Sequence, residues 1–73
     1  MQDYKERFIK EYKELLERAC KLGSMLNSYE DNELDFVPTC SYELLSAQYH
    51  AMWTYLYILE QRAKIEKINL NRR

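Results

Sequence analysis

The stretch from Leu44 to Ile68, LLSAQYHAMWTYLYILEQRAKIEKI, decides how this chain can fold. Its centre, AMWTYLYIL from Ala51 to Leu59, places apolar or aromatic side chains on every face of a helix, whereas a surface helix keeps one face polar. The chain has 73 residues, so residues 1–73 are expected to form a single small domain. Because so short a chain has little to bury this helix against, the sequence predicts that other copies of the chain cover part of it.

A second amphipathic helix is predicted over about residues 3–29. Asp3 followed by Glu6 has the spacing of a capping box, which marks a helix start. The apolar residues after it recur every three or four positions, which is the period of a helix. They are Tyr4, Phe8, Tyr12, Leu15, Ala19, Leu22, Leu26 and Tyr29. Gly23, the only glycine, interrupts this pattern, and the sequence leaves open whether it bends the helix or ends it.

The segment 30–38, EDNELDFVP, separates the two predicted helices. Its acids and its proline form a composition that ends helices, so a loop is expected there and the second helix over about residues 40–68. The apolar residues of the loop, Leu34, Phe36 and Val37, are expected to fold back onto the helix ends.

Two helices joined by a short loop predict an antiparallel hairpin. This arrangement sets Asp3 to Phe8 beside Arg62 to Ile68, and it sets Cys20 opposite His50 and far from Cys40. The two cysteines are therefore expected to be reduced, partly buried thiols. Residues 69–73 are expected to form a fraying basic tail.

Two stripes of the second helix have different predicted roles. The stripe expected to face the first helix is Leu45, Gln48, Met52, Tyr55, Leu59 and Arg62. Gln48 and Arg62 are polar within it and are predicted to fix the register and the oligomeric state, with contact to a ligand as the alternative. The interface with other copies is predicted to consist of Ala51, Trp53, Leu56, Tyr57, Ile58 and Ile65. The predicted fold class is all-α, an antiparallel two-helix hairpin that assembles into a symmetric helical oligomer.

The composition argues against several classes of function. With 11 basic and 12 acidic residues of alternating sign, the chain has no cationic face for a long nucleic acid. Its apolar runs are much shorter than the ~20 residues that span a bilayer, so no membrane partner is predicted and a cytoplasmic location is expected. His50 stands alone, and no serine or cysteine lies in a catalytic pattern, so no metal, no cofactor and no enzyme activity are predicted.

Three groups of residues carry a resemblance that covers nearly the whole chain. They are an opening Y-x-x-R with a K-E-L stretch (Tyr4, Arg7, Lys13, Glu14, Leu15), an L-D-F-x-P-x-C loop (Leu34, Asp35, Phe36, Pro38, Cys40), and L-L-x-x-Q-x-x-A-M-x-x-Y-x-x-I-L-x-x-R (Leu44, Leu45, Gln48, Ala51, Met52, Tyr55, Ile58, Leu59, Arg62). With these motifs the sequence resembles a family of small phage-encoded proteins first catalogued in crAss-like phages and widespread in Firmicutes prophages. More distantly, it resembles the helical-hairpin domain of phage anti-CBASS and anti-Thoeris sponge proteins. That resemblance implies an oligomeric hairpin that sequesters cyclic nucleotide signals.

Tyr4, Arg7 and Arg62 are the predicted ligand-binding residues. A cyclic dinucleotide needs flat rings to stack on its bases and cationic forks for its phosphates, and the hairpin brings these three residues to its open end. A two-fold oligomer doubles the set. The alternative is that Arg7 pairs with Glu11, that Arg62 caps a seam and that Tyr4 only packs.

Three functions follow from these features. The first is an anti-defence protein of a phage, acting in the host bacterial cytoplasm, that captures a cyclic di- or trinucleotide between protomers. The second is an inhibitor of a host defence protein, such as a nuclease, acting through Trp53 and Tyr57 or through the acidic loop. The third is a structural accessory protein without a ligand.

Overall fold

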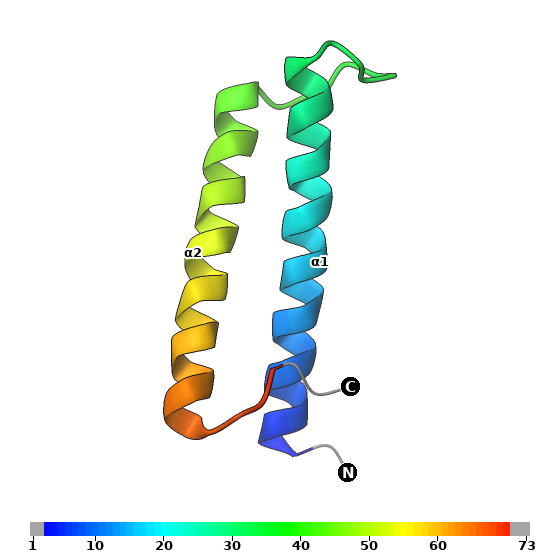
Figure 1. Cartoon of the computed structure of the whole chain (residues 1–73). Helices are drawn as coiled ribbons and strands as arrows, with labels where there is room; N and C mark the ends of the chain where they lie inside the picture. The colour runs from blue at the N-terminus through cyan, green and yellow to red at the C-terminus, as the bar shows by residue number, and fades with distance from the viewer. Residues whose placement is uncertain (1–2, 71–73) are drawn as a thin grey trace.

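The computed structural model describes residues 3–70, which form two long helices lying side by side (Figure 1). Helix α1 spans Tyr4–Glu30 and helix α2 spans Tyr42–Glu66. The helices run antiparallel and are joined by the loop 31–41 (Figure 1). The predicted all-α hairpin is confirmed. Of the predicted tail, residues 71–73 lie outside the described residues.

Helix α1 has a defined cap at each end. The Asp3 carboxylate accepts a hydrogen bond from the backbone N–H of Glu6 at 2.8 Å, which satisfies a free donor of the first turn. At the other end Asn32 adopts a left-handed conformation with φ 58°, and the N–H of Glu33 bonds back to the carbonyl of Ser28. This is the hydrogen-bond pattern of a Schellman motif, in which asparagine replaces the usual glycine. Gly23 lies inside the helix, so it does not end α1.

Helix α2 starts at a serine cap and ends two residues earlier than predicted. The Ser41 hydroxyl accepts from the N–H of Leu44 at 3.2 Å. Lys67 is left-handed with φ 59°, and the N–H of Ile68 bonds to the carbonyl of Ala63 at 2.8 Å. The chain therefore reverses at Lys67 and runs back toward the start of α1, in orange to red in Figure 1. As a result Ile68 is buried and Leu70 packs against the core.

The core occupies the half of the hairpin that is farthest from the loop. Its cluster of buried residues comprises Phe8, Leu15, Ala19, Leu56, Leu59, Ala63 and Ile68. Leu26 is also buried but stands apart from this cluster. No polar residue is buried between residues 3 and 70, so the interior of the hairpin is wholly apolar.

The face that α2 turns toward α1 differs from the prediction. Leu56 was assigned to the interface with other copies, but it has 0% exposure inside the hairpin and is not available to a partner. Gln48 and Arg62, assigned to the inner stripe, are both exposed. The inward face is built from Leu56, Leu59 and Ala63. This orientation buries only apolar groups, whereas the predicted one buries an amide and a guanidinium, which is costly without hydrogen-bond partners.

The other five predicted interface residues remain on the surface. Ala51, Ile58 and Ile65 are seven residues apart and share one outward stripe with Leu44. Ile65 is 80% exposed and Ile58 46% exposed. Trp53 and Tyr57, with exposures of 39% and 61%, lie outside this stripe. The surplus apolar surface of α2 therefore falls on two areas instead of one.

The loop and the cysteines depart from expectation in their exposure. Leu34 is half-buried, but Phe36 and Val37 point into solvent, and Val37 is 93% exposed. Cys20 and Cys40 are both free and exposed instead of partly buried. Neither of the two described helices is apolar over a length that crosses a membrane.

Candidate functional site

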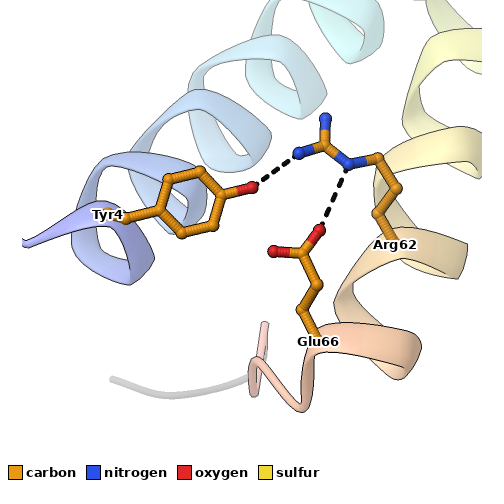
Figure 2. Close-up of polar contacts among 3 residues, drawn as sticks. All are labelled: Tyr4, Arg62 and Glu66. Carbon is orange, nitrogen blue, oxygen red and sulfur yellow. Dashed lines mark hydrogen bonds and ion pairs between the residues drawn. The ribbon is translucent and has the colours of Figure 1, made fainter.

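Arg62 is the centre of a polar cluster at the open end of the hairpin. Its Nη2 donates to the Tyr4 hydroxyl at 2.6 Å, which joins residues 58 positions apart in the sequence. Its Nε donates to Glu66 one turn further along α2 at 3.4 Å. Figure 2 shows the guanidinium between the two partners, reaching across from α2 to α1. The structure thus brings together two of the three predicted ligand-binding residues, Tyr4 and Arg62.

Two aromatic rings hold the guanidinium in place. The Cζ atom of Arg62 lies 5.0 Å from the centroid of the Phe8 ring, a distance typical of a cation–π contact. The Tyr4 ring meets the Phe8 ring edge to face, with centroids 6.1 Å apart. Desolvation lowers the pKa of Arg62, but the Tyr4 hydroxyl and the Glu66 carboxylate outweigh it and raise this pKa above its usual value. The guanidinium therefore remains protonated beside an exposed tyrosine, with its charge paired to Glu66.

Arg7 lies on the turn of α1 after Tyr4 and is exposed. Within residues 3–70 its side chain makes no described bond to Tyr4 or Arg62. The alternative pairing with Glu11 is not observed among the described contacts of residues 3–70; Glu11 accepts a hydrogen bond from Tyr55 across the hairpin. Arg7 is thus a second cation at the same end of the molecule, one helical turn from the cluster.

The sequence reasoning missed Phe8 and Glu66 as parts of this site. Phe8 was read only as a core residue, although one face of its ring supports Arg62. A signal was present in both cases, because Tyr4 with Phe8 and Arg62 with Glu66 have the i,i+4 spacing that makes helical neighbours meet. Because the sequence pattern predicts Arg62 on the buried stripe, it predicts neither its contact with Phe8 nor its contact with Glu66.

A second tyrosine–carboxylate pair fastens the opposite edge of the hairpin. The Tyr12 hydroxyl donates to Glu60 at 2.7 Å, in a partly buried position. Burial and this hydrogen bond raise the pKa of Tyr12 from 10.0 to about 12. The pair joins α1 to α2 and so stabilises the hairpin. It also gives the Glu60 carboxylate a hydrogen-bond donor in its partly buried position.

Comparison with known proteins gives one match. A family model described as Sequestin covers residues 2–65, which include α1, the loop and all of α2 except its last residue. No curated protein and no solved structure is similar enough to be matched. Because the family match extends over most of the 73 residues, this protein belongs to the Sequestin family.

Proposed function

We propose that this protein is a phage or prophage product that blocks a bacterial defence system by sequestering a cyclic oligonucleotide in the host cytoplasm. The name of the family supports the capture of a ligand. The resemblance to phage sponge proteins supports the class of ligand and the phage origin. The observation that carries the proposal is the Arg62 cluster, a guanidinium supported on the ring of Phe8 and bonded to an exposed tyrosine.

This cluster has the chemistry that a cyclic oligonucleotide requires. A guanidinium binds phosphate oxygens through several N–H groups at once, and the bonds to Tyr4 and Glu66 leave some of these groups free. The Tyr4 ring is 47% exposed and offers a face for stacking. The bond to Glu66 is long at 3.4 Å and partly exposed, so a phosphate competes with it at little cost.

One hairpin supplies only half of such a site, so the ligand is held between protomers. A cyclic dinucleotide carries two phosphates and two bases, and a two-fold assembly doubles Tyr4, Arg7 and Arg62. The outward stripe of Leu44, Ala51, Ile58 and Ile65 supports this assembly, because a seven-residue apolar repeat is the pattern of a helix–helix seam.

The ligand is tested by thermal unfolding with a panel of cyclic di- and trinucleotides. A ligand present at about 100 times its Kd adds about 2.7 kcal/mol to the free energy of unfolding, so the midpoint is expected to rise with ligand concentration. The double variant Arg7→Ala with Arg62→Ala is expected to lose this rise. Arg18→Ala, which removes an exposed cation of α1 about three helical turns from Arg7, is the matched control. A melting curve that the whole panel leaves unmoved refutes the proposal for those ligands.

The assembly is tested by sedimentation of the pure protein. The expected mass is a multiple of 8.9 kDa. Ile58→Glu places a charge in the middle of the outward stripe and is expected to give a monomer. Val37→Glu makes the same change at a solvent-exposed loop position and is expected to leave the mass unchanged. A wild-type monomer at micromolar concentration contradicts the assembly and the shared site together.

Inhibition of a host defence protein is the second candidate, and the loop favours it. Phe36 and Val37 expose apolar surface next to the carboxylates of Glu33 and Asp35. This combination fits an apolar pocket with a cationic rim. Phage infection of bacteria that carry a defence system distinguishes the two functions. If the protein is an inhibitor, changing Phe36 and Val37 to serine is expected to abolish its protection of the phage, and Arg62→Ala is expected to retain it. Under sequestration the two variants behave in the opposite way.

A further inference from the structure

A groove of about 450 Å³ runs between the helices in the half of the hairpin next to the loop. Gly23, Asn27 and Glu30 line it from α1, and Tyr49, His50 and Trp53 line it from α2. The groove shares no residue with the Arg62 cluster. Counted along α1, Gly23 is about 30 Å from Tyr4. It is therefore a separate surface, for which neither the predicted site nor the proposed function accounts.

Gly23 gives the groove its shape. A Cβ atom at this position would lie 2.8 Å from Cε1 of Tyr49, closer than Cβ atoms approach other atoms, and 3.1 Å from its hydroxyl oxygen, which is tighter than most such contacts. The missing side chain lets the Tyr49 ring lie against the backbone of α1. A glycine in the middle of a helix costs about 1 kcal/mol relative to alanine, so its presence here is accounted for by this close approach.

Tyr49 in turn orders two further rings. The rings of His50 and Trp53 stand nearly perpendicular to it, at 84° and 78°, with centroids 5.8 and 6.3 Å away. Trp53 remains 39% exposed, and His50 is exposed. The groove thus has aromatic walls that are held in position and are open to a ligand. Such walls favour a flat ring, because stacking on an aromatic side chain is the strongest contact they offer.

Among the side chains that line the groove, the Glu30 carboxylate is the one group that only accepts hydrogen bonds, whereas the serine, asparagine and tyrosine groups both donate and accept. Glu30 is its only charged residue, and no lysine or arginine lines it, which makes it unsuited to a phosphate. Nδ1 of His50 lies 2.8 Å from the carbonyl oxygen of Ser46. Because a carbonyl only accepts, Nδ1 carries the proton, and in the neutral ring Nε2 is left as an acceptor. Desolvation and the neighbouring Glu30 carboxylate raise the pKa of Tyr42, and this carboxylate has lone pairs to offer a ligand.

We propose that this groove binds a flat heteroaromatic ring that presents N–H donors, and that among the nucleobases guanine fits it best. Guanine carries two neighbouring donor groups, the ring N1–H and the exocyclic amine, which together match a carboxylate. Adenine and cytosine each offer an amine beside a ring acceptor, so they pair less well with Glu30. The site recognises the base alone, and it stands whether or not the Arg62 cluster binds a cyclic nucleotide.

The single tryptophan allows a direct test, because Trp53 lies in the groove and is the only one in the chain. Guanosine, adenosine and cytidine are titrated separately while the emission of Trp53 is recorded with excitation at the red edge of its absorption. Guanosine is expected to give a saturable change and to bind about tenfold more tightly than the other two, the effect of one additional hydrogen bond to a charged group. Calorimetric titration of the same nucleosides provides an independent readout.

Two variants separate the two parts of the proposal. Gly23→Ala displaces Tyr49 and is expected to weaken guanosine binding by about tenfold, one lost stacking contact, while circular dichroism shows full helix content. Glu30→Gln is expected to weaken guanosine by about tenfold and to leave adenosine unchanged. Glu14→Gln, at an exposed carboxylate elsewhere on α1, is the matched control.

The result that overturns the site is an absence of saturable binding by any nucleoside, or wild-type affinity in Gly23→Ala. Equal binding of all three nucleosides, or guanosine binding that Glu30→Gln does not change, overturns the proposal that the N–H donors of guanine pair with Glu30. Because nucleosides carry no phosphate, Arg62→Ala is expected to bind guanosine like the wild type. Cyclic nucleotides without guanine that fail to bind would therefore refute the proposed function for those ligands and leave the proposal for this groove standing.

Discussion

The open-end half of the hairpin, residues 3–20 and 52–70, is packed differently from the loop half, residues 21–51. The open-end half contains the whole buried cluster, and the returning segment with Ile68 and Leu70 covers it. In the loop half the only buried side chain is that of Leu26, and the helices meet there through aromatic edges, such as Tyr29 against Tyr42 with centroids 5.4 Å apart. The looser packing leaves room for the groove. Most of the apolar stabilisation therefore lies in one half, and most of the residues that line the groove lie in the other.

The largest expected difference between the halves comes from the same substitution made in each. Leu56→Ala leaves a cavity in a fully buried position of the open-end half and is expected to lower the free energy of unfolding by about 2–5 kcal/mol. Leu45→Ala, at a half-buried position of the loop half, is expected to lower it by about 1 kcal/mol. Urea unfolding of both variants measures the difference. Equal losses would mean that the loop half contributes as much as the core does.

A smaller effect is expected from the Tyr12–Glu60 bond of the open-end half. Tyr12→Phe removes a partly buried hydrogen bond and is expected to cost about 1 kcal/mol at neutral pH. The unfolded chain releases the Tyr12 proton near pH 10, whereas the folded chain retains it to about pH 12. The free energy of unfolding of the wild type therefore falls as pH rises through this interval.

Urea unfolding at a series of alkaline pH values tests this linkage. The decrease in the free energy of unfolding with rising pH is expected to be smaller in Tyr12→Phe than in the wild type, because the variant has no hydroxyl at position 12 to titrate. Tyr57→Phe, at a position that is 61% exposed, is the control and is expected to keep the slope of the wild type. Identical slopes in all three proteins would show that the bond to Glu60 does not persist in solution.

The smallest effect is expected in the loop itself. Val37 is 93% exposed, so Val37→Ser removes almost no buried surface and is expected to change the free energy of unfolding by less than about 0.5 kcal/mol. The same urea experiment measures this change. A loss of more than 1 kcal/mol, on the order of a buried methylene group, would show that the loop is covered in solution by another part of the assembly.

The sequence predicted the helices and their pairing but not the rotation of α2. The period of three and four residues predicted the buried Phe8, Leu15, Ala19 and Leu26 of α1, and the antiparallel arrangement predicted the contact of Tyr4 with Arg62. For α2 the same reasoning failed, because AMWTYLYIL is apolar on every side and no single face is distinguished by its pattern. The inward position of Leu56 depends on the complete set of contacts with α1.

The reversal at Lys67 and the groove were missed for local reasons. A left-handed residue at a helix end is usually glycine, and a lysine gives no such signal, so α2 was extended to Ile68. Gly23 did carry a signal, since a lone glycine destabilises a helix and one reason for its presence is close packing. The residue that approaches it is Tyr49 on the other helix, and the sequence alone does not identify that partner.

The position of the core has a consequence for the order of folding. In the open-end half, the hydrogen bonds Tyr12–Glu60 and Arg62–Tyr4 join residues 48 and 58 positions apart in the sequence. The loop half, by contrast, buries little apolar surface. Most of the entropy of chain closure must therefore be lost before burial compensates for it. We therefore expect that the hairpin does not close progressively from its turn, and that its transition state contains contacts between α1 and the second half of α2. It is expected to fold more slowly than a hairpin of the same length with its core beside the loop.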